Sequence, residues 1–218
     1  MNTSPVWQPP ISKHPGWKDH WESLYAHRDP SEFRWYQAHP QHSLSLIADT
    51  GLDTTASIID IGGGASTLVD HLLQAGYRDL TVLDIARTAL MQAQQRLGNR
   101  SQQVTWVESD VTEYSPGHTF DIWHDRAVFH FLTDERDRDS YLEALHKTLK
   151  PDGQVIIATF SDSGPSQCSG LDIVRYRPET LSLVLGPQRL HLVETFTEEH
   201  RTPSGGLQQF VYCRFRRK

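Results

Sequence analysis

Short apolar segments alternate with amphipathic ones through the middle of the chain. Segments such as 57–61 (Ser-Ile-Ile-Asp-Ile) and 80–84 (Leu-Thr-Val-Leu-Asp) are rich in aliphatic residues, which is typical of buried strands. The intervening segments carry apolar residues at helical spacing. Strands and helices in alternation predict an α/β fold with a parallel sheet and right-handed crossovers. The expected strands are 57–61, 80–84, 103–107, 119–124 and 153–160, and the expected helices lie near 66–76, 86–97 and 137–150.

The N-terminal part departs from this alternation. Residues 1–16 contain four prolines and predict a loose arm. Helices are expected over 17–28 and 41–48, and the first of them carries large apolar side chains on one side. We expect residues 1–56 to form an arm and an aromatic helical cover over a core of 57–218, within one domain overall. The side chains on that side of the first helix are Trp17, Trp21, Leu24 and Tyr25.

The pattern changes again after residue 160. Ser161 to Gly170 is rich in Ser and Gly and predicts a loop, which is followed by a helix over 178–185. Two alternating segments, 188–197 and 207–215, flank Pro203-Ser204-Gly205-Gly206. They predict an antiparallel hairpin at the C-terminal end.

Composition limits the possible partners. A net charge of −6 over 218 residues gives no general attraction to nucleic acid, and the basic segment Arg214–Lys218 is expected to be a solvated tail. The cysteines, Cys168 and Cys213, do not form a disulfide framework. No apolar run approaches the roughly 18 residues that span a bilayer, and we expect no secretory signal because a charged segment followed by an apolar one is not visible near residue 1. We expect a cytoplasmic protein that is a monomer or weak dimer and binds neither nucleic acid nor membrane.

A glycine-rich turn follows the first strand of the core. Gly62, Gly63 and Gly64 come directly after an apolar strand and lead into a helix, as in nucleotide-binding turns. The dinucleotide fingerprint would place a glycine where Thr67 stands, which argues against NAD or FAD. Asp60, two residues before the first glycine, suits a ligand with a cationic end. The amino group of S-adenosylmethionine is such an end.

Two further strands also end in acids. Asp84 lies twenty residues after Gly64 and can accept hydrogen bonds from both ribose hydroxyls of an adenosine. Asp110 is placed to accept from an adenine amino group, and Val111 to pack on the ring. Alternatively, each acid only caps the helix that follows it. Three acids in succession at strand ends favour ligand binding.

These segments resemble the class I S-adenosylmethionine-dependent methyltransferases over residues from about 17 to 215. The turn Leu149-Lys150-Pro151-Asp152-Gly153-Gln154 is also similar to theirs, with Asp152 replacing a glycine. The resemblance implies a Rossmann-like three-layer sandwich whose seven-stranded, mostly parallel sheet has the order 3-2-1-4-5-7-6. It implies S-adenosyl-L-methionine as cofactor. The residues expected to bind it are Trp21, Tyr25, Trp35, Asp60, Gly62, Gly63, Gly64, Asp84, Ile85, Asp110 and Val111.

The segment after the fourth strand bears on the methyl acceptor. It lacks the Asn-Pro-Pro-aromatic motif of many amine methyltransferases. Trp123-His124-Asp125-Arg126-Ala127 is instead similar to the Trp-Asp-Arg-Gly segment of the thiopurine and thiol S-methyltransferases, with His124 inserted and Ala127 replacing glycine. This similarity favours a small-molecule acceptor, a thiol or related chalcogenide. Protein lysine methylation and a non-catalytic cofactor-binding module are the alternatives.

Four residues are the catalytic candidates. Asp125 and Arg126 are expected beside the methionine end of the cofactor, or else to form a surface pair. A histidine with an ordinary pKa near 6.5 can deprotonate a thiol, so His124 and His130 are candidate bases, although each can equally be a packing residue. Arg126 and Arg175 can hold an acceptor that is already an anion.

Aromatic residues gather in the expected cover. The spacing of Trp17, Trp21 and Tyr25, followed by Trp35, resembles the N-terminal cover of the thiol methyltransferases and of the seven-strand lysine methyltransferases. We expect Trp21, Tyr25 or Trp35 to touch the cofactor and Trp17 to be structural. Cys168 is expected in the pocket wall. None of the twelve histidines belongs to a cluster with metal-ligand spacing, so no metal site is expected.

Overall fold

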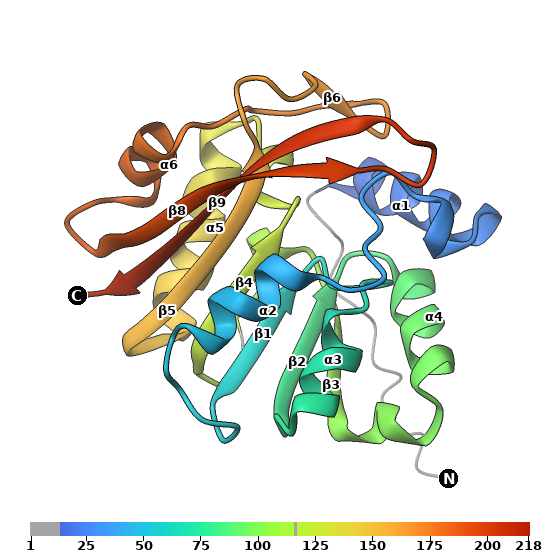
Figure 1. Ribbon diagram of the computed structural model, residues 1–218, viewed down its shortest axis with the longest axis horizontal. Coiled ribbons are helices and arrows are strands. Elements are labelled where there is room, and N and C mark those ends of the chain that lie inside the picture. Colours follow the sequence, from blue (N-terminus) through green and yellow to red (C-terminus); the bar gives the residue numbers. More distant parts are fainter. Residues whose placement is uncertain (1–13, 116) are drawn as a thin grey trace, which may run out of the picture.

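The computed structural model describes residues 14–115 and 117–218, and a seven-stranded sheet lies at its centre (Figure 1). Its order is β3-β2-β1-β4-β5-β9-β8; the first five strands are parallel, β9 is antiparallel to them, and β8, which pairs antiparallel with β9, runs in the same direction as the first five. Because β8 and β9 are the two final long strands of the chain, this is the predicted order. The strands are β1 (Ser57–Ile61), β2 (Asp79–Asp84), β3 (Val104–Glu108), β4 (Phe120–Arg126), β5 (Leu149–Phe160), β8 (Leu190–Arg201) and β9 (Leu207–Arg217).

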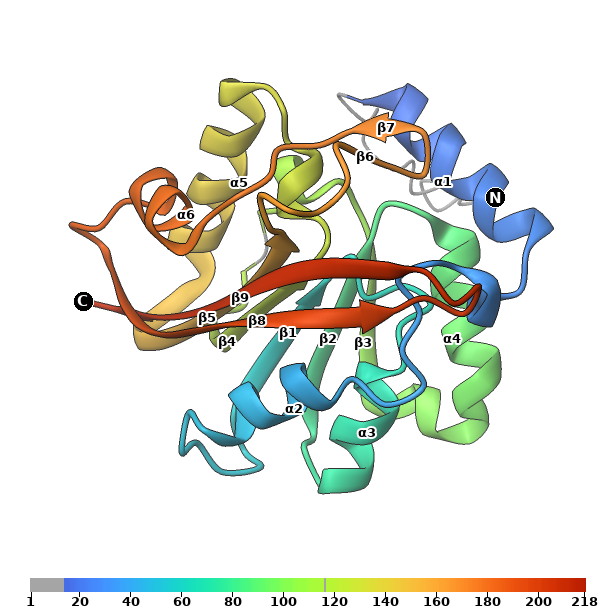
Figure 2. The same cartoon turned by 45° about the horizontal axis from the view of Figure 1, so that its top comes forward.

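Helices cover both faces of the sheet and make three layers (Figures 1 and 2). Helices α2, α3 and α4 pack on one face and α5 and α6 on the other, while α1 lies at the carboxyl edge of the parallel strands. The predicted fold class is confirmed. The helices are α1 (Pro15–His27), α2 (Gln41–Ala48), α3 (Leu68–Ala75), α4 (Arg87–Leu97), α5 (Glu135–Thr148) and α6 (Pro178–Leu185), with short 3₁₀ helices at Pro30–Glu32, Gly98–Gln103, Val111–Glu113 and Phe129–Phe131.

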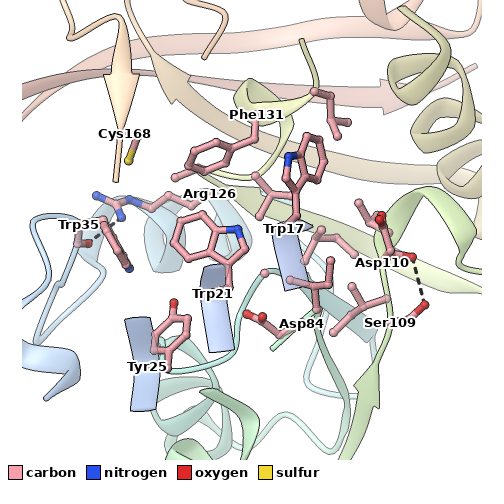
Figure 3. A pocket seen from close by; sticks show the side chains of 18 residues that line it. Trp17, Trp21, Tyr25, Trp35, Asp84, Ser109, Asp110, Arg126, Phe131 and Cys168 are labelled. Atoms are coloured by element: carbon pink, nitrogen blue, oxygen red, sulfur yellow. Dashed lines mark hydrogen bonds between the residues drawn. The ribbon is translucent and has the colours of Figure 1, made fainter. Parts of the chain in front are cut away.

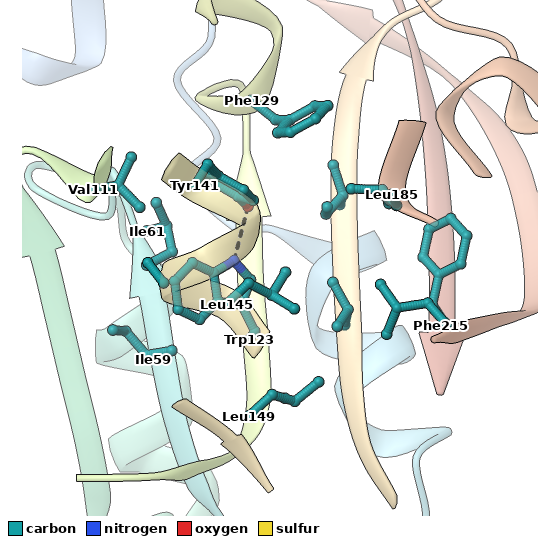
Figure 4. Close-up of a cluster of buried hydrophobic side chains, with 14 of the residues drawn as sticks. Ile59, Ile61, Val111, Trp123, Phe129, Tyr141, Leu145, Leu149, Leu185 and Phe215 are labelled. Carbon is teal, nitrogen blue, oxygen red and sulfur yellow. Dashed lines mark hydrogen bonds between the residues drawn. The ribbon is translucent and has the colours of Figure 1, made fainter. Parts of the chain in front are cut away.

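Successive strand residues supply two separate cores, because side chains alternate across a sheet. In β1, Ile58 packs toward α2 and α3, whereas Ile59 packs toward α5. In β4, Trp123 joins Ile59 in the α5-side core, where its indole N–H donates to the Tyr141 hydroxyl at 2.8 Å (Figure 4). This alternation decides which residues of β4 reach the candidate site.

Several elements differ from expectation. Strand β5 begins at Leu149 and not at 153, and β9 extends through Arg217, so most of the basic segment Arg214–Lys218 is strand and not a solvated tail. The predicted loop 161–170 contributes to a small hairpin of β6 (Gln167–Cys168) and β7 (Leu171–Asp172), which lies near α1 in both views (Figures 1 and 2). Strand β4 also continues two residues beyond the expected 119–124, because its final residues pair with β5. No helix among residues 14–115 and 117–218 has both the length and the apolar character needed to cross a membrane.

Candidate active site

A cavity opens at the carboxyl edge of the parallel strands, between the sheet and α1 (Figure 3). We call it the main cavity. A second, smaller one, the glycine-loop cavity, adjoins it, since Tyr25, Trp35, Gly62 and Arg126 line both. The main cavity is lined by Trp17, Trp21, Tyr25, Trp35, Ile61, Gly62, Leu83, Asp84, Ile85, Ser109, Asp110, Val111, Arg126, Ala127, Val128, Phe131, Leu132 and Cys168.

The three glycines after β1 form a close-packed cradle. Gly62 has φ +65°, which favours glycine, and a Cβ there would lie 2.1 Å from Val128 Cγ2. A Cβ on Gly63 would lie 2.4 Å from Asp60 Oδ2, and one on Gly64 would lie 2.4 Å from Asp84 Oδ2. The missing side chains therefore leave both carboxylates open to whatever the loop holds.

Asp60 is buried and only half paired. Its Oδ1 lies 2.7 Å from Nδ1 of His124, and Nε2 of the same ring lies 2.9 Å from the Ser43 hydroxyl on α2. Oδ2 of Asp60 is buried and has no hydrogen-bond partner. Asp60, His124 and Ser43 all line the glycine-loop cavity. His124 does not line the main cavity.

Asp84 lies at the end of β2 on the floor of the main cavity. Its carboxylate accepts from the backbone N–H of Gly64 at 3.0 Å and from that of Ala86 at 2.8 Å. Burial raises the pKa of Asp84 to about 7, although the two backbone donors act in the opposite direction. The prediction that it holds a ribose stays a prediction, for which this position is suitable.

Asp110 follows β3 and also has one free oxygen. Oδ1 accepts from the backbone N–H and the hydroxyl of Thr112, whereas Oδ2 is buried without a partner. Ile85 and Val111 add apolar surface to the same end of the main cavity. Asp110 therefore caps the turn that follows it with one oxygen and leaves the other as an unused hydrogen-bond acceptor.

Arg126 stands where the two cavities meet. Its Nε donates to the Tyr212 hydroxyl at 2.8 Å. Its Nη1 donates to the Trp35 carbonyl at 2.9 Å (Figure 3). Nη2 makes no hydrogen bond and lies 3.8 Å from Oε2 of Glu198, which is also unpartnered. Glu198 in turn accepts from the Gln37 side chain at 2.7 Å. The charge of Arg126 is thus matched by a carboxylate from the C-terminal hairpin.

The two remaining catalytic candidates lie elsewhere. Asp125 is fully buried and lines neither cavity, because it points to the α5 face. His130 is likewise fully buried, with its ring stacked on Phe160, and burial lowers its pKa to about 3. Arg175, considered as an anion holder, donates to the carbonyls of Asp162 and Gly164 instead.

The aromatic cover lines the main cavity. Trp21 packs edge-on against both Trp35 and Phe131, and Trp35 stacks on Phe33 at 4.6 Å. In Figure 3 the indole of Trp21 lies among the other labelled side chains. Trp17, expected to be structural, lines the cavity as well as packing against the α5-side core. Cys168 lines it from β6, as expected, and burial raises the pKa of its thiol to about 11.

Sequence reasoning missed the residues that approach from distant segments. Ser43, Gln37 and Glu198 join the network around Asp60 and Arg126. None carries a motif, and no local signal marks them. In the described residues, no group of three or more His, Cys, Asp or Glu side chains is placed to hold a metal ion.

Comparisons with known proteins agree with this geometry. Residues 59–155 match the methyltransferase domain family. The eEF1A lysine and N-terminal methyltransferase of Mus musculus is 26% identical over 162 residues, which are 71% of this chain and 23% of that protein. The chain therefore spans less than a quarter of that relative's length.

Solved structures share the fold. A SAM-dependent methyltransferase from Anabaena variabilis has a TM-score of 0.74 at 13% identity, with both chains covered completely. The N-methyltransferase NodS from Bradyrhizobium japonicum, in complex with S-adenosylhomocysteine, has a TM-score of 0.67 at 22% identity, covering 91% of this chain and 98% of NodS. At these identities the likeness establishes the fold.

The matched domain and the related sequences are those of methyltransferases, and the solved structures share their fold, so the chain is similar to the class I S-adenosylmethionine-dependent methyltransferases. The predictions of an enzyme and of S-adenosylmethionine as its cofactor are confirmed at this level.

Proposed function

We propose that this methyltransferase acts on an amine nitrogen of a protein, a lysine side chain or an N-terminal amine. This reading replaces the thiol acceptor as the preferred one. The aromatic lining of the main cavity carries the proposal, and the pairing of Arg126 with Glu198 supports it. The cofactor binding on which it depends is supported by the free polar atoms of the two cavities.

Three buried polar atoms on the cavity walls lack partners: Oδ2 of Asp60, Oδ2 of Asp110 and Nη2 of Arg126. Buried polar atoms are almost always hydrogen-bonded, so free ones on a cavity wall are positions where a ligand can supply the partner. Two acceptors and one donor suit the ammonium, the adenine amine and the carboxylate of S-adenosylmethionine. Asp84 would hold the ribose, and Ile85 and Val111 would contact the adenine.

The acceptor side of the main cavity is aromatic and nearly uncharged. Trp17, Trp21 and Phe131 present ring surface, and aromatic faces attract a sulfonium group through cation–π interactions. When bound, S-adenosylmethionine supplies an activated methyl group that a nitrogen lone pair displaces in line. An amine must first lose a proton, and an apolar enclosure favours the neutral amine because it penalises the charge.

A thiolate acceptor has less support. A cation that faces the acceptor would favour its binding. Among the residues that the structure describes, Arg126 is the only Lys or Arg that lines either cavity; it lies near Glu198, and its free nitrogen is assigned here to the carboxylate of the cofactor. The similarity to the eEF1A lysine and N-terminal methyltransferase favours nitrogen as well.

Methyl transfer to a matched set of acceptors tests the proposal. The set contains a lysine peptide with a blocked N-terminus, a lysine-free peptide with a free N-terminus, a peptide with neither amine, and a simple thiol. Radiolabel from S-adenosylmethionine is expected on one of the first two and not on the third. Label on the thiol with none on either amine peptide would overturn the proposed acceptor. The cofactor assignment is tested separately by calorimetry with S-adenosylhomocysteine.

A further inference from the structure

We propose that His124 and Ser43 are positioning residues, which hold Asp60 so that its free oxygen meets the ammonium group of the cofactor's methionine. The inference rests on the proposed cofactor binding. It gives His124 a role other than the base expected from sequence, and it brings α2 into the site.

The register of the sheet creates this arrangement. Asp60 on β1 and His124 on β4 are direct partners in the parallel ladder, so their side chains leave the same face of the sheet side by side. Helix α2 packs on that face and places Ser43 beyond the imidazole. Exposure is 4% for Asp60, 3% for His124 and 1% for Ser43. The three side chains therefore form one buried row that ends beneath the glycine loop.

Hydrogen-bond chemistry fixes the direction of the row. An ionised carboxylate only accepts, so Nδ1 of His124 carries the proton that is shared with Oδ1 of Asp60 at 2.7 Å. In the neutral ring, Nε2 then accepts from the Ser43 hydroxyl at 2.9 Å. With both ring nitrogens engaged, the imidazole is held in one orientation, and it holds Asp60 in turn.

This arrangement determines where the second oxygen of Asp60 points. Oδ2 of Asp60 is buried and unpartnered, and it faces the space above Gly63 where a Cβ would lie 2.4 Å away. A carboxylate free to rotate would spend part of its time in other directions. The row removes that freedom, so the oxygen is pre-organised for a donor that enters the glycine-loop cavity. An ammonium group on a nucleoside is the donor that this cavity suits.

A pair of nucleosides isolates this effect. S-adenosylhomocysteine carries the ammonium group, whereas 5′-methylthioadenosine has the same adenosine and thioether without the amino acid. The affinity ratio of the two, measured by calorimetry, reports on the amino-acid end alone. For Ser43→Ala and His124→Leu we expect S-adenosylhomocysteine affinity to fall about fivefold and more than tenfold, respectively, with little change for 5′-methylthioadenosine.

A conservative variant provides the rescue. The amide nitrogen of an asparagine takes nearly the position of Nδ1, so His124→Asn keeps the donor to Asp60 and should recover most of the ratio lost in His124→Leu. Thr148→Val is the matched control, since the Thr148 hydroxyl is fully buried on α5 and lines neither cavity. It should leave the ratio unchanged.

The outcomes distinguish the positioning role of His124 and Ser43 from the proposed cofactor binding on which it rests. Wild-type protein that binds neither nucleoside overturns the cofactor site and the positioning role together. Wild-type binding with equal losses for both nucleosides in Ser43→Ala and His124→Leu, or with no loss in either variant, overturns the positioning role alone. If His124→Leu does not fold, the smaller Ser43→Ala change carries the test.

Discussion

Neighbouring residues on β4 enter two buried polar networks that differ in how completely they are paired. On the α5 face, Asp125 accepts from the backbone N–H groups of Val128 and Phe129 and from the Tyr141 hydroxyl at 2.8 Å. On the α2 face, one oxygen of Asp60 and one nitrogen of Arg126 have no hydrogen-bond partner. A saturated network serves the fold, whereas an unsaturated one retains the capacity to bind a ligand.

The difference has an energetic meaning. Asp125 fixes the turn from β4 to the Phe129–Phe131 3₁₀ turn and ties it to α5 through Tyr141. Its partners are all within the protein, so nothing is gained there when a ligand arrives. Asp60 gives up a hydrogen bond in the free protein, and a ligand that supplies the donor recovers it.

The same substitution at the two aspartates should separate these roles. Asp125→Asn places an amide N–H₂ against the backbone donors or the Tyr141 hydroxyl, which leaves buried donors unpaired. We expect it to lower the free energy of unfolding by about 2–3 kcal/mol. Urea denaturation measures this loss. A loss below about 0.5 kcal/mol would mean that the network on the α5 face does not support the fold.

Asp60→Asn should behave in the opposite way. The amide oxygen can still accept from His124, and the nitrogen replaces an atom that has no partner, so the stability should change by less than about 1 kcal/mol. Affinity for S-adenosylhomocysteine should fall at least about tenfold, because a charge-assisted hydrogen bond is lost. Calorimetry on the two variants, each at a temperature where it is folded, measures the contrast. Equal affinities of Asp60→Asn and Asp125→Asn for S-adenosylhomocysteine would contradict the different roles given to the two aspartates.

The raised pKa of Asp84 leads us to expect that cofactor binding depends on pH. Its pKa in the ligand-free protein is raised by burial to about 7, so the carboxyl is largely protonated below that pH. Ribose hydroxyls donate to the ionised form, so affinity should fall as the pH drops below 7, by up to about tenfold per unit. Titrations of S-adenosylhomocysteine between pH 5 and pH 8 measure this slope.

The control for this slope is Asp84→Asn, which should bind more weakly but with a flat profile over the same range. The folded state also keeps a proton that the unfolded chain releases, so this group should make the ligand-free protein less stable as the pH rises from about 4 to 7. A wild-type affinity that is constant across this range would contradict the role of Asp84.

The smallest expected effect concerns backbone strain at the end of β4. Ala127 lines the main cavity with φ +71°, a region that costs a residue with a Cβ about 1–2 kcal/mol. Ala127→Gly relieves this strain but adds freedom to the unfolded chain, so the melting temperature should rise by only about 2 °C. Calorimetric melting tests it. A lower melting temperature would show that the backbone is unstrained there.

The fold could be predicted because its signals are local. The apolar strands, the glycine turn and the acids that end β1 and β2 lie within short segments, and their order along the chain implies the sheet. The residue types at Asp60, Asp84 and Asp110 likewise indicated which strand ends form the cavities. Even Ala127 stood out as a replaced glycine, and its positive φ gives the physical reason.

The orientation of the side chains could not be predicted in the same way. With β4 expected to end at His124, Asp125 and Arg126 were placed together at the site. The strand continues through Arg126, so alternation sends Asp125 to the α5 face. The partners Ser43 and Glu198 come from segments that only tertiary packing brings together, which no local pattern encodes.

A crystal structure with bound S-adenosylhomocysteine would show whether the free oxygens of Asp60 and Asp110 bind the cofactor. We expect the ammonium to lie within hydrogen-bond distance of Asp60 Oδ2 and the adenine amine within that distance of Asp110 Oδ2, with the network around Asp125 unchanged. A nucleoside bound elsewhere, or bound with both of these oxygens still unpartnered, would contradict it.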